Sequence, residues 1–153
     1  IFIKNNRTSC TMRNNLCSFV MQDPDYQLFT ASVHEELLLG TYKQEKDILS
    51  ICKKFCIDTL LSQKPQFLSM GQKQRTLLAA SFLSQKDIIL LDEPTSGMDY
   101  QNMELLVNII KELTTSGKLI ITVTHDYDFI HKACTKILYF SNQHLQPLYT
   151  EKE

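Results

Sequence analysis

Apolar residues recur along much of the chain at the spacing of amphipathic helices. Positions three or four residues apart predict helices over 44–57, 69–83 and 101–115. The third segment has the clearest series, formed by Met103, Leu106, Val107, Ile110 and Leu113. A shorter helix is predicted over 32–39, where Ser32 and Glu35 have the spacing of a capping box and Gly40 would end the helix.

Continuous apolar runs alternate with these helices. The runs "IILL" (88–91) and "KLIITVT" (118–124) predict strands buried on both faces of a sheet. Further strands are predicted at 1–3, 16–21, 136–140 and 145–149, the last two as an edge hairpin, and a polar stretch separates the first two. The order strand, helix, strand, helix predicts an α/β fold with a parallel sheet.

Composition narrows the class of protein. The chain has 153 residues, 43% hydrophobic and 22% charged, which is the profile of a globular domain. With a net charge of −1, the chain has no excess of positive charge of the kind that binds nucleic acid or an anionic membrane. Every apolar run is too short to cross a bilayer. No signal peptide is visible, and the chain begins at Ile1 inside a predicted strand, which predicts a piece of a longer protein.

The five cysteines contain no CxxC pair and are Cys10, Cys17, Cys52, Cys56 and Cys134. Cys52 and Cys56 are four apart and would share a helix face, but no further metal ligand lies nearby. Free thiols in a reducing cytoplasm are therefore predicted in preference to a metal site.

Two acids, Asp92 and Glu93, directly follow the run "IILL", and His125 follows "ITVT". Ligands of open α/β sheets bind beyond the carboxyl ends of the strands, so these side chains predict a site. Mg²⁺ together with phosphate oxygens would stabilise a carboxylate there, and the second acid could orient and deprotonate a water. The alternative for the acidic dipeptide alone is a turn with solvated carboxylates.

Three motifs in order resemble the nucleotide-binding domain of ABC transporters. "LSMGQKQR" resembles the ABC signature, "IILLDEPTSGMD" resembles Walker B followed by the D-loop, and "VTHD" resembles the switch-histidine motif. From Ser69 to Asp92 is 92 − 69 = 23 positions and from Asp92 to His125 is 125 − 92 = 33, both typical of the family. "VMQDPDYQLF" resembles the Q-loop of energy-coupling factor and cobalt-type importer ATPases. The resemblance runs from Ile1 to about Tyr149.

The resemblance implies a role for each matching residue in binding and hydrolysing ATP. Asp92 would hold Mg²⁺, Glu93 would be the general base, and His125 would contact the γ-phosphate. Gln22 would contact Mg²⁺ and sense the γ-phosphate. The loop 23–30 would face a transmembrane partner; its alternative is an ordinary Asp-Pro turn.

The signature residues Ser69, Gly71 and Gln72 begin a helix, whose free N–H groups suit an anion. The resemblance implies that they bind the γ-phosphate of ATP held by a second ABC ATPase subunit, and that Asp99 crosses the dimer interface. A local reading as a serine N-cap is compatible with this role. Lys73 and Arg75 are interpreted as solvated or structural charges.

The sequence departs from the family pattern at several positions. No GxxxxGK[ST] phosphate loop occurs, and only 21 residues precede Gln22, so this chain alone is predicted to bind ATP weakly and not to hydrolyse it. Met70 replaces a signature glycine, and its side chain could crowd the γ-phosphate. Met98 stands where the D-loop usually has Leu, and Asn142 where the terminal hairpin often has Gly.

The expected fold is a single partial ABC ATPase domain over 1–153. Its predicted parts are the end of a β-subdomain with the Q-loop at 1–23, a small helical subdomain at 24–85, and a catalytic core at 86–153. The expected function is an ATPase subunit, at the cytoplasmic face of the membrane, of an importer for a vitamin or a transition-metal ion. The alternatives are a non-hydrolytic regulatory half and a soluble ABC protein acting on DNA or the ribosome, which the neutral charge and the short 22–69 spacing disfavour.

Overall fold

The computed structural model describes residues 2–3, 6–39, 41, 44–141 and 144–148. Its α-helices are α1 (Cys10–Leu16), α2 (Val33–Leu38), α3 (Glu45–Lys54), α4 (Met70–Leu83), α5 (Tyr100–Thr115) and α6 (Tyr127–Ala133). Its strands are β1 (Phe2–Ile3), β2 (Asn6–Arg7), β3 (Cys17–Val20), β4 (Ile88–Asp92), β5 (Leu119–Val123), β6 (Ile137–Ser141) and β7 (His144–Leu148). Short 3-10 turns are η1 (Pro24–Tyr26), η2 (Asp58–Leu60) and η3 (Pro65–Phe67). None of the described helices is long and apolar enough to span a membrane.

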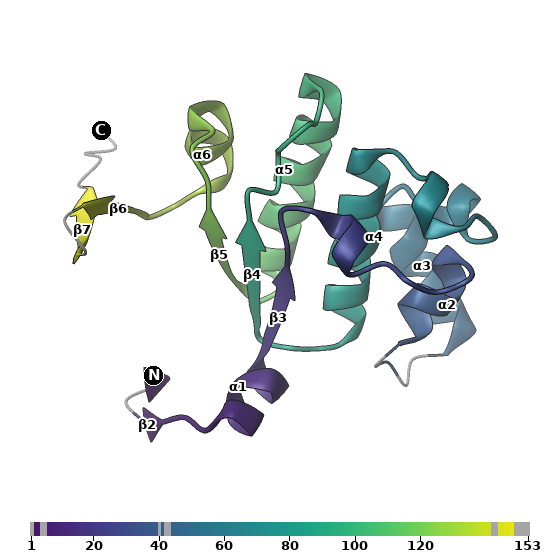
Figure 1. Cartoon of the computed structure of the whole chain (residues 1–153), viewed down its shortest axis with the longest axis horizontal. Coiled ribbons are helices and arrows are strands. Elements are labelled where there is room, and N and C mark those ends of the chain that lie inside the picture. Colours follow the sequence, from purple (N-terminus) through teal and green to yellow (C-terminus); the bar gives the residue numbers. More distant parts are fainter. Residues whose placement is uncertain (1, 4–5, 40, 42–43, 142–143, 149–153) are drawn as a thin grey trace.

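The central sheet is parallel, as the sequence predicts, and has the order β3-β4-β5. Val20 is paired with Leu91, and Asp92 with Val123, so the three strands end at one edge. Two antiparallel pairs, β1-β2 and β6-β7, lie apart from this sheet at the two ends of the chain (Figure 1). The hairpin predicted near the C-terminal end is confirmed over the described residues, but it forms a separate antiparallel pair and does not lie at the edge of the parallel sheet.

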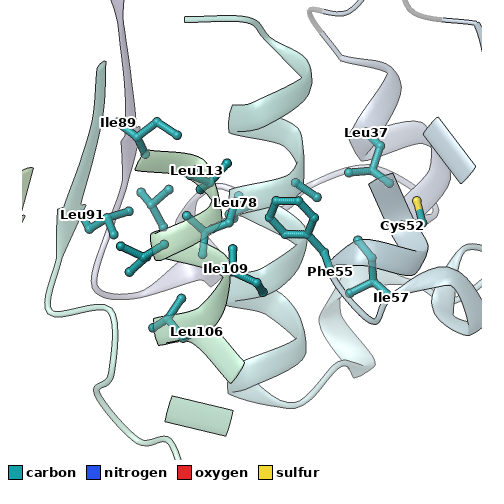
Figure 2. Close-up of a cluster of buried hydrophobic side chains, with 14 of the residues drawn as sticks. Leu37, Cys52, Phe55, Ile57, Leu78, Ile89, Leu91, Leu106, Ile109 and Leu113 are labelled. Atoms are coloured by element: carbon teal, nitrogen blue, oxygen red, sulfur yellow. The ribbon is translucent and has the colours of Figure 1, made fainter. Parts of the chain in front are cut away.

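One apolar core joins the sheet to the helices. The sheet contributes Ile89 and Leu91, and α4 and α5 contribute Leu78 and Leu106, all at most 1% exposed. Figure 2 shows the same cluster continuing from α4 to Phe55 beside α3, away from the sheet. The five apolar positions predicted for the α5 segment are all buried, which confirms the helical periodicity.

The opposite face of the sheet is exposed among the described residues. In β5, Leu119, Ile121 and Val123 are 54%, 47% and 64% exposed, and Phe19 of β3 is 46% exposed. The prediction that 118–124 is buried on both faces is therefore wrong, and β4 is fully buried only at alternate positions. The physical reason is that the described helices α4 and α5 cover only one face of the sheet (Figure 1).

Helix α1 occupies part of the polar stretch for which the sequence predicted no element. Ser9 begins it, since the serine side chain accepts a hydrogen bond from Met12 N at 3.1 Å. Arg13 Nη1 donates to the carbonyl oxygen of Thr8 at 3.0 Å. Local capping thus forms this helix where apolar periodicity gives no signal, because none of its residues is buried.

The predicted helix over 44–57 ends early. Helix α3 stops at Lys54, and Cys56 takes a left-handed conformation with φ of 53°. Cys52 and Cys56 consequently do not share a helix face: Cys52 is buried and Cys56 exposed. Burial raises the pKa of the Cys52 thiol to about 11, so this cysteine is a neutral part of the core.

The predicted capping box of α2 forms only in part. Ser32 Oγ accepts from Glu35 N at 3.2 Å, whereas the Glu35 carboxylate accepts from Ala31 N at 3.1 Å instead of from the serine N–H. The glutamate thus satisfies an N–H one residue earlier. Sequence interpretations at Ile1, Gly40, Asn142 and Tyr149 lie outside the described residues.

Candidate functional site

The candidate site lies where the three parallel strands end. Gln22 follows β3, Asp92 closes β4, and His125 follows β5. Figure 1 shows that the N-termini of α4 and α5 point toward the same edge, the upper one in that view. The fold therefore places the signature residues and the strand-end residues on one side of the molecule.

Glu93 and His125 form a hydrogen-bonded pair. The two atoms His125 Nδ1 and Glu93 Oε1 are 2.8 Å apart, and Thr124 Oγ1 donates to Glu93 Oε2 at 3.2 Å. The backbone N–H of Glu93 donates to Val123 O at 2.9 Å and fixes the residue at φ of 43°, a left-handed conformation that is costly for a non-glycine residue. The glutamate side chain is 19% exposed and the imidazole 89% exposed.

The hydrogen bond to Glu93 raises the pKa of His125 above its ordinary value. The stabilisation from the charged pair is therefore fully present below the unfolded-state pKa of about 6.5 and is lost as pH rises through the higher folded-state pKa. We expect the imidazole NMR titration of His125 to have a midpoint above 6.5 and to move down in Glu93→Gln. An unchanged midpoint in that variant, with the exposed His131 as an internal reference, would contradict the pairing.

Asp92 and Gln22 provide oxygen atoms that fit Mg²⁺. The Asp92 side chain is half-buried, and among the described residues it has no hydrogen-bond or ion-pair partner. Gln22 is exposed and equally unpartnered within the described chain. Mg²⁺ prefers a few carboxylate or carbonyl oxygens together with water or phosphate oxygens, so these two residues suit it. No group of three or more His, Cys, Asp or Glu side chains in the described part could hold a metal ion alone.

Two side chains that the sequence interpretation did not single out shape the loop after Gln22. The Gln27 amide accepts from Met21 N at 2.7 Å and donates to Phe19 O at 2.8 Å, which closes the loop against the end of β3. Glu36 is 5% exposed and accepts three hydrogen bonds, two from the backbone N–H groups of residues 29 and 30 and one from the Thr30 hydroxyl. In the sequence, Glu36 could have been noticed as the second of two acidic residues in the first turn of α2.

The signature segment forms the N-terminus of α4 as predicted. Ser69 and Gln72 make a full capping box, with Gln72 Oε1 accepting from Ser69 N at 2.9 Å. The S-x-x-Q spacing of Ser69 and Gln72 in the sequence could have predicted this capping box. Lys73 is 8% exposed and forms an ion pair with Asp25 at 2.6 Å, and Arg75 is 7% exposed. Both are structural charges, and neither is solvated.

Asp99 is the N-cap of α5. Its carboxylate accepts from Asn102 N at 2.8 Å, so in this structure it faces its own helix. Among the site residues predicted from the sequence, hydrogen bonds join Glu93 to His125 and Ser69 to Gln72. Among the described residues they join neither Gln22 nor Asp92 to either pair.

The arrangement defines an ABC-type nucleotide-binding fold, and comparisons with known proteins agree. CbiO1 from Clostridium perfringens, part of the ABC transporter complex CbiONQ, superimposes with a TM-score of 0.79 at 27% identity, over 94% of this chain and 61% of that one. The family model described as ABC transporter matches residues 3–96. The chain belongs to this family, which confirms the resemblance inferred from the sequence.

Two relatives refine the placement. A Treponema denticola protein described as a candidate ABC transporter ATP-binding protein is 41% identical over 82% of this chain and 26% of its own length. The energy-coupling factor transporter ATP-binding protein EcfA2 of Mycoplasmopsis synoviae is 34% identical over 80% of this chain and 42% of its own length. The chain thus spans less than half of either relative.

Proposed function

We propose that this chain supplies the catalytic carboxylate of an ATP-hydrolysing subunit of an ABC importer. The observation that carries the proposal is the Glu93–His125 pair at the carboxyl ends of β4 and β5. Membership of the ABC family supports ATP as the nucleotide.

In this proposal Glu93 accepts the proton of the attacking water. Its carboxylate is held by His125 and Thr124, so the base is positioned before substrate arrives. His125 is largely exposed, so its other ring nitrogen, Nε2, could contact the γ-phosphate while Nδ1 stays bonded to Glu93. Asp92 and Gln22 would hold Mg²⁺, which when bound neutralises charge on the phosphates.

The N-terminus of α4 is proposed to face ATP bound by a second ABC ATPase subunit. Gly71 and the capped pair Ser69 and Gln72 present the positive end of a 14-residue helix, which suits an anion. Asp99, at the start of α5, would lie at the same dimer interface. The net charge of the chain, −1, gives no indication of a nucleic-acid partner.

A transmembrane subunit is the proposed partner of the loop after Gln22. Tyr26 and Phe29 are 79% and 73% exposed, while Gln27 and Glu36 hold the loop backbone beneath them. Exposed aromatic side chains on a fixed backbone suit a protein interface. The likeness to EcfA2 and CbiO1 supports import of a vitamin or a transition-metal ion, with the chain at the cytoplasmic face of the membrane.

ATP turnover by the native polypeptide, assembled with its partner subunits, tests the proposal. Turnover that Glu93→Gln removes supports it, and equal turnover in both proteins contradicts it. The 153-residue chain alone, which contains no phosphate-loop motif, is expected to show no turnover above its own Glu93→Gln variant.

Met70 favours a second candidate function, a regulatory half with a weakened composite site. Its side chain occupies the signature position where the family has glycine. Met70 Cγ lies 3.9 Å from the point where a Cβ added to Gly97, in the D-loop, would lie. If the side chain crowds the γ-phosphate, Met70→Gly raises turnover of the assembled complex several-fold, about 1 kcal/mol in the barrier. Met98→Leu, an apolar substitution at a methionine that packs against the core, is the control. Unchanged turnover in Met70→Gly would show that the methionine is tolerated.

A further inference from the structure

The Asn102 side chain lies between the signature helix α4 and Asp99 of the D-loop, and it is hydrogen-bonded to both segments. This residue lies in the first turn of α5, three positions after Asp99. A Cβ placed on Gly71 would lie 2.8 Å from Asn102 Oδ1 and 3.2 Å from Asn102 Cβ. Glycine at position 71 therefore serves a local purpose, because it makes room for the Asn102 amide.

The Asn102 amide also makes a polar bridge between the two segments. Arg75 Nη1 donates to Asn102 Oδ1 at 2.6 Å, and Asn102 Nδ2 donates to Asp99 Oδ1 at 2.9 Å. A guanidinium can only donate and a carboxylate only accepts, so the amide orientation is fixed by its two partners. Aspartate, serine or alanine could each cap or continue this helix, but only an amide satisfies both neighbours.

Burial makes this bridge costly to break. Arg75 is 7% exposed, its Nε is buried without a partner, and Asn102 is its only side-chain hydrogen-bond partner among the described residues. Without the Asn102 oxygen, the guanidinium would keep its buried position with no acceptor, which is unfavourable for a charged group.

We propose that Asn102 is a positioning residue that fixes the D-loop to the signature helix, so that Asp99 and the α4 N-terminus move as one body. This inference rests on the proposed function, in which both segments face the second subunit. Asn102 itself touches neither nucleotide nor water in this account. Its removal should therefore lower kcat and leave the ATP affinity unchanged.

Asn102→Asp separates positioning from structural support. The carboxylate keeps an acceptor for Arg75 and suits the N-terminus of a helix, but it loses the donor to Asp99 and places two like charges together. In the native assembled protein we expect Asn102→Asp to keep the thermal midpoint and to lose turnover about tenfold, with KM for ATP unchanged. Asn108→Ala, an exposed asparagine on the same helix, is the matched control. Turnover within threefold of the unmodified protein in Asn102→Asp would overturn the proposal.

A double-mutant cycle tests the contact without using activity. Gly71→Ala should lower the urea midpoint of the native protein, because the new Cβ overlaps the Asn102 side chain. In the Asn102→Ala background this loss should be clearly smaller, since the amide atoms at 2.8 and 2.9 Å are gone and only the Cβ at 3.2 Å remains close, and since alanine is the better helix former. An equal loss in both backgrounds would overturn the contact. Absence of turnover that depends on Glu93 would instead refute the proposed function, whatever the cycle shows.

Discussion

Replacing Glu93 by Gln is expected to lower ATP turnover of the native assembled protein by about two to four orders of magnitude, the range for loss of a general base. Glutamine has nearly the same shape, and its amide oxygen can still meet a donor on His125 or Thr124. The backbone N–H to Val123 is unaffected, so the left-handed conformation at position 93 is retained. The loss should therefore lie in kcat, while ATP binding is kept.

The matched control for this variant is Asp87→Asn, which removes a carboxylate just before the other end of β4. Asp87 is exposed and lies at the opposite edge of the sheet from Glu93. We expect unchanged turnover in this variant. Turnover of Glu93→Gln within about threefold of that of the unmodified protein would contradict a general-base role.

Replacing Phe55 by Ala is expected to reduce the free energy of unfolding by about 3–5 kcal/mol, the range for truncating a buried phenylalanine. Phe55 is fully buried, and its ring centroid lies 6.1 Å from that of Phe82 on α4. The variant removes packing between the end of α3 and α4, in the part of the core that lies on the far side of α4 from the sheet (Figure 2). Urea unfolding of the native protein measures the change.

Phe29→Ala is the control for this effect, because Phe29 is 73% exposed and its truncation should change the free energy of unfolding by no more than about 0.5 kcal/mol. Similar losses in the two variants would show that the cluster around Phe55 is not a close-packed part of the core. A large loss only in Phe55→Ala supports one core shared by the helices and the sheet.

The elements that the sequence predicted well are those with strong local signals. Helix α4 follows from Ser69 as N-cap, α5 from its apolar series, and β4 from its apolar run before Asp92. Strand-end chemistry also predicted the neighbourhood of Glu93 and His125, because parallel strands end at one edge.

The features that escaped prediction depend on contacts remote in sequence or on polar capping. The burial of β5 depends on which elements cover each face of the sheet, and an apolar run in the sequence does not predict those elements. Helix α1 has no buried residue, so only its Ser9 cap could have indicated it. Asn102 reads as an ordinary polar residue in a first helical turn, and its link to Arg75, 27 positions away, emerges only in three dimensions.

The measurement that most directly tests the central claim is NMR of the native protein with ATP and paramagnetic Mn²⁺ in place of Mg²⁺, since both ions prefer oxygen ligands. The claim is that the edge carrying Asp92 and Glu93 receives the metal and phosphates. We predict that the imidazole signals of His125 broaden as Mn²⁺-ATP binds, while those of His34, on α2, stay sharp. Binding of Mn²⁺-ATP with no selective broadening of His125 would contradict the account.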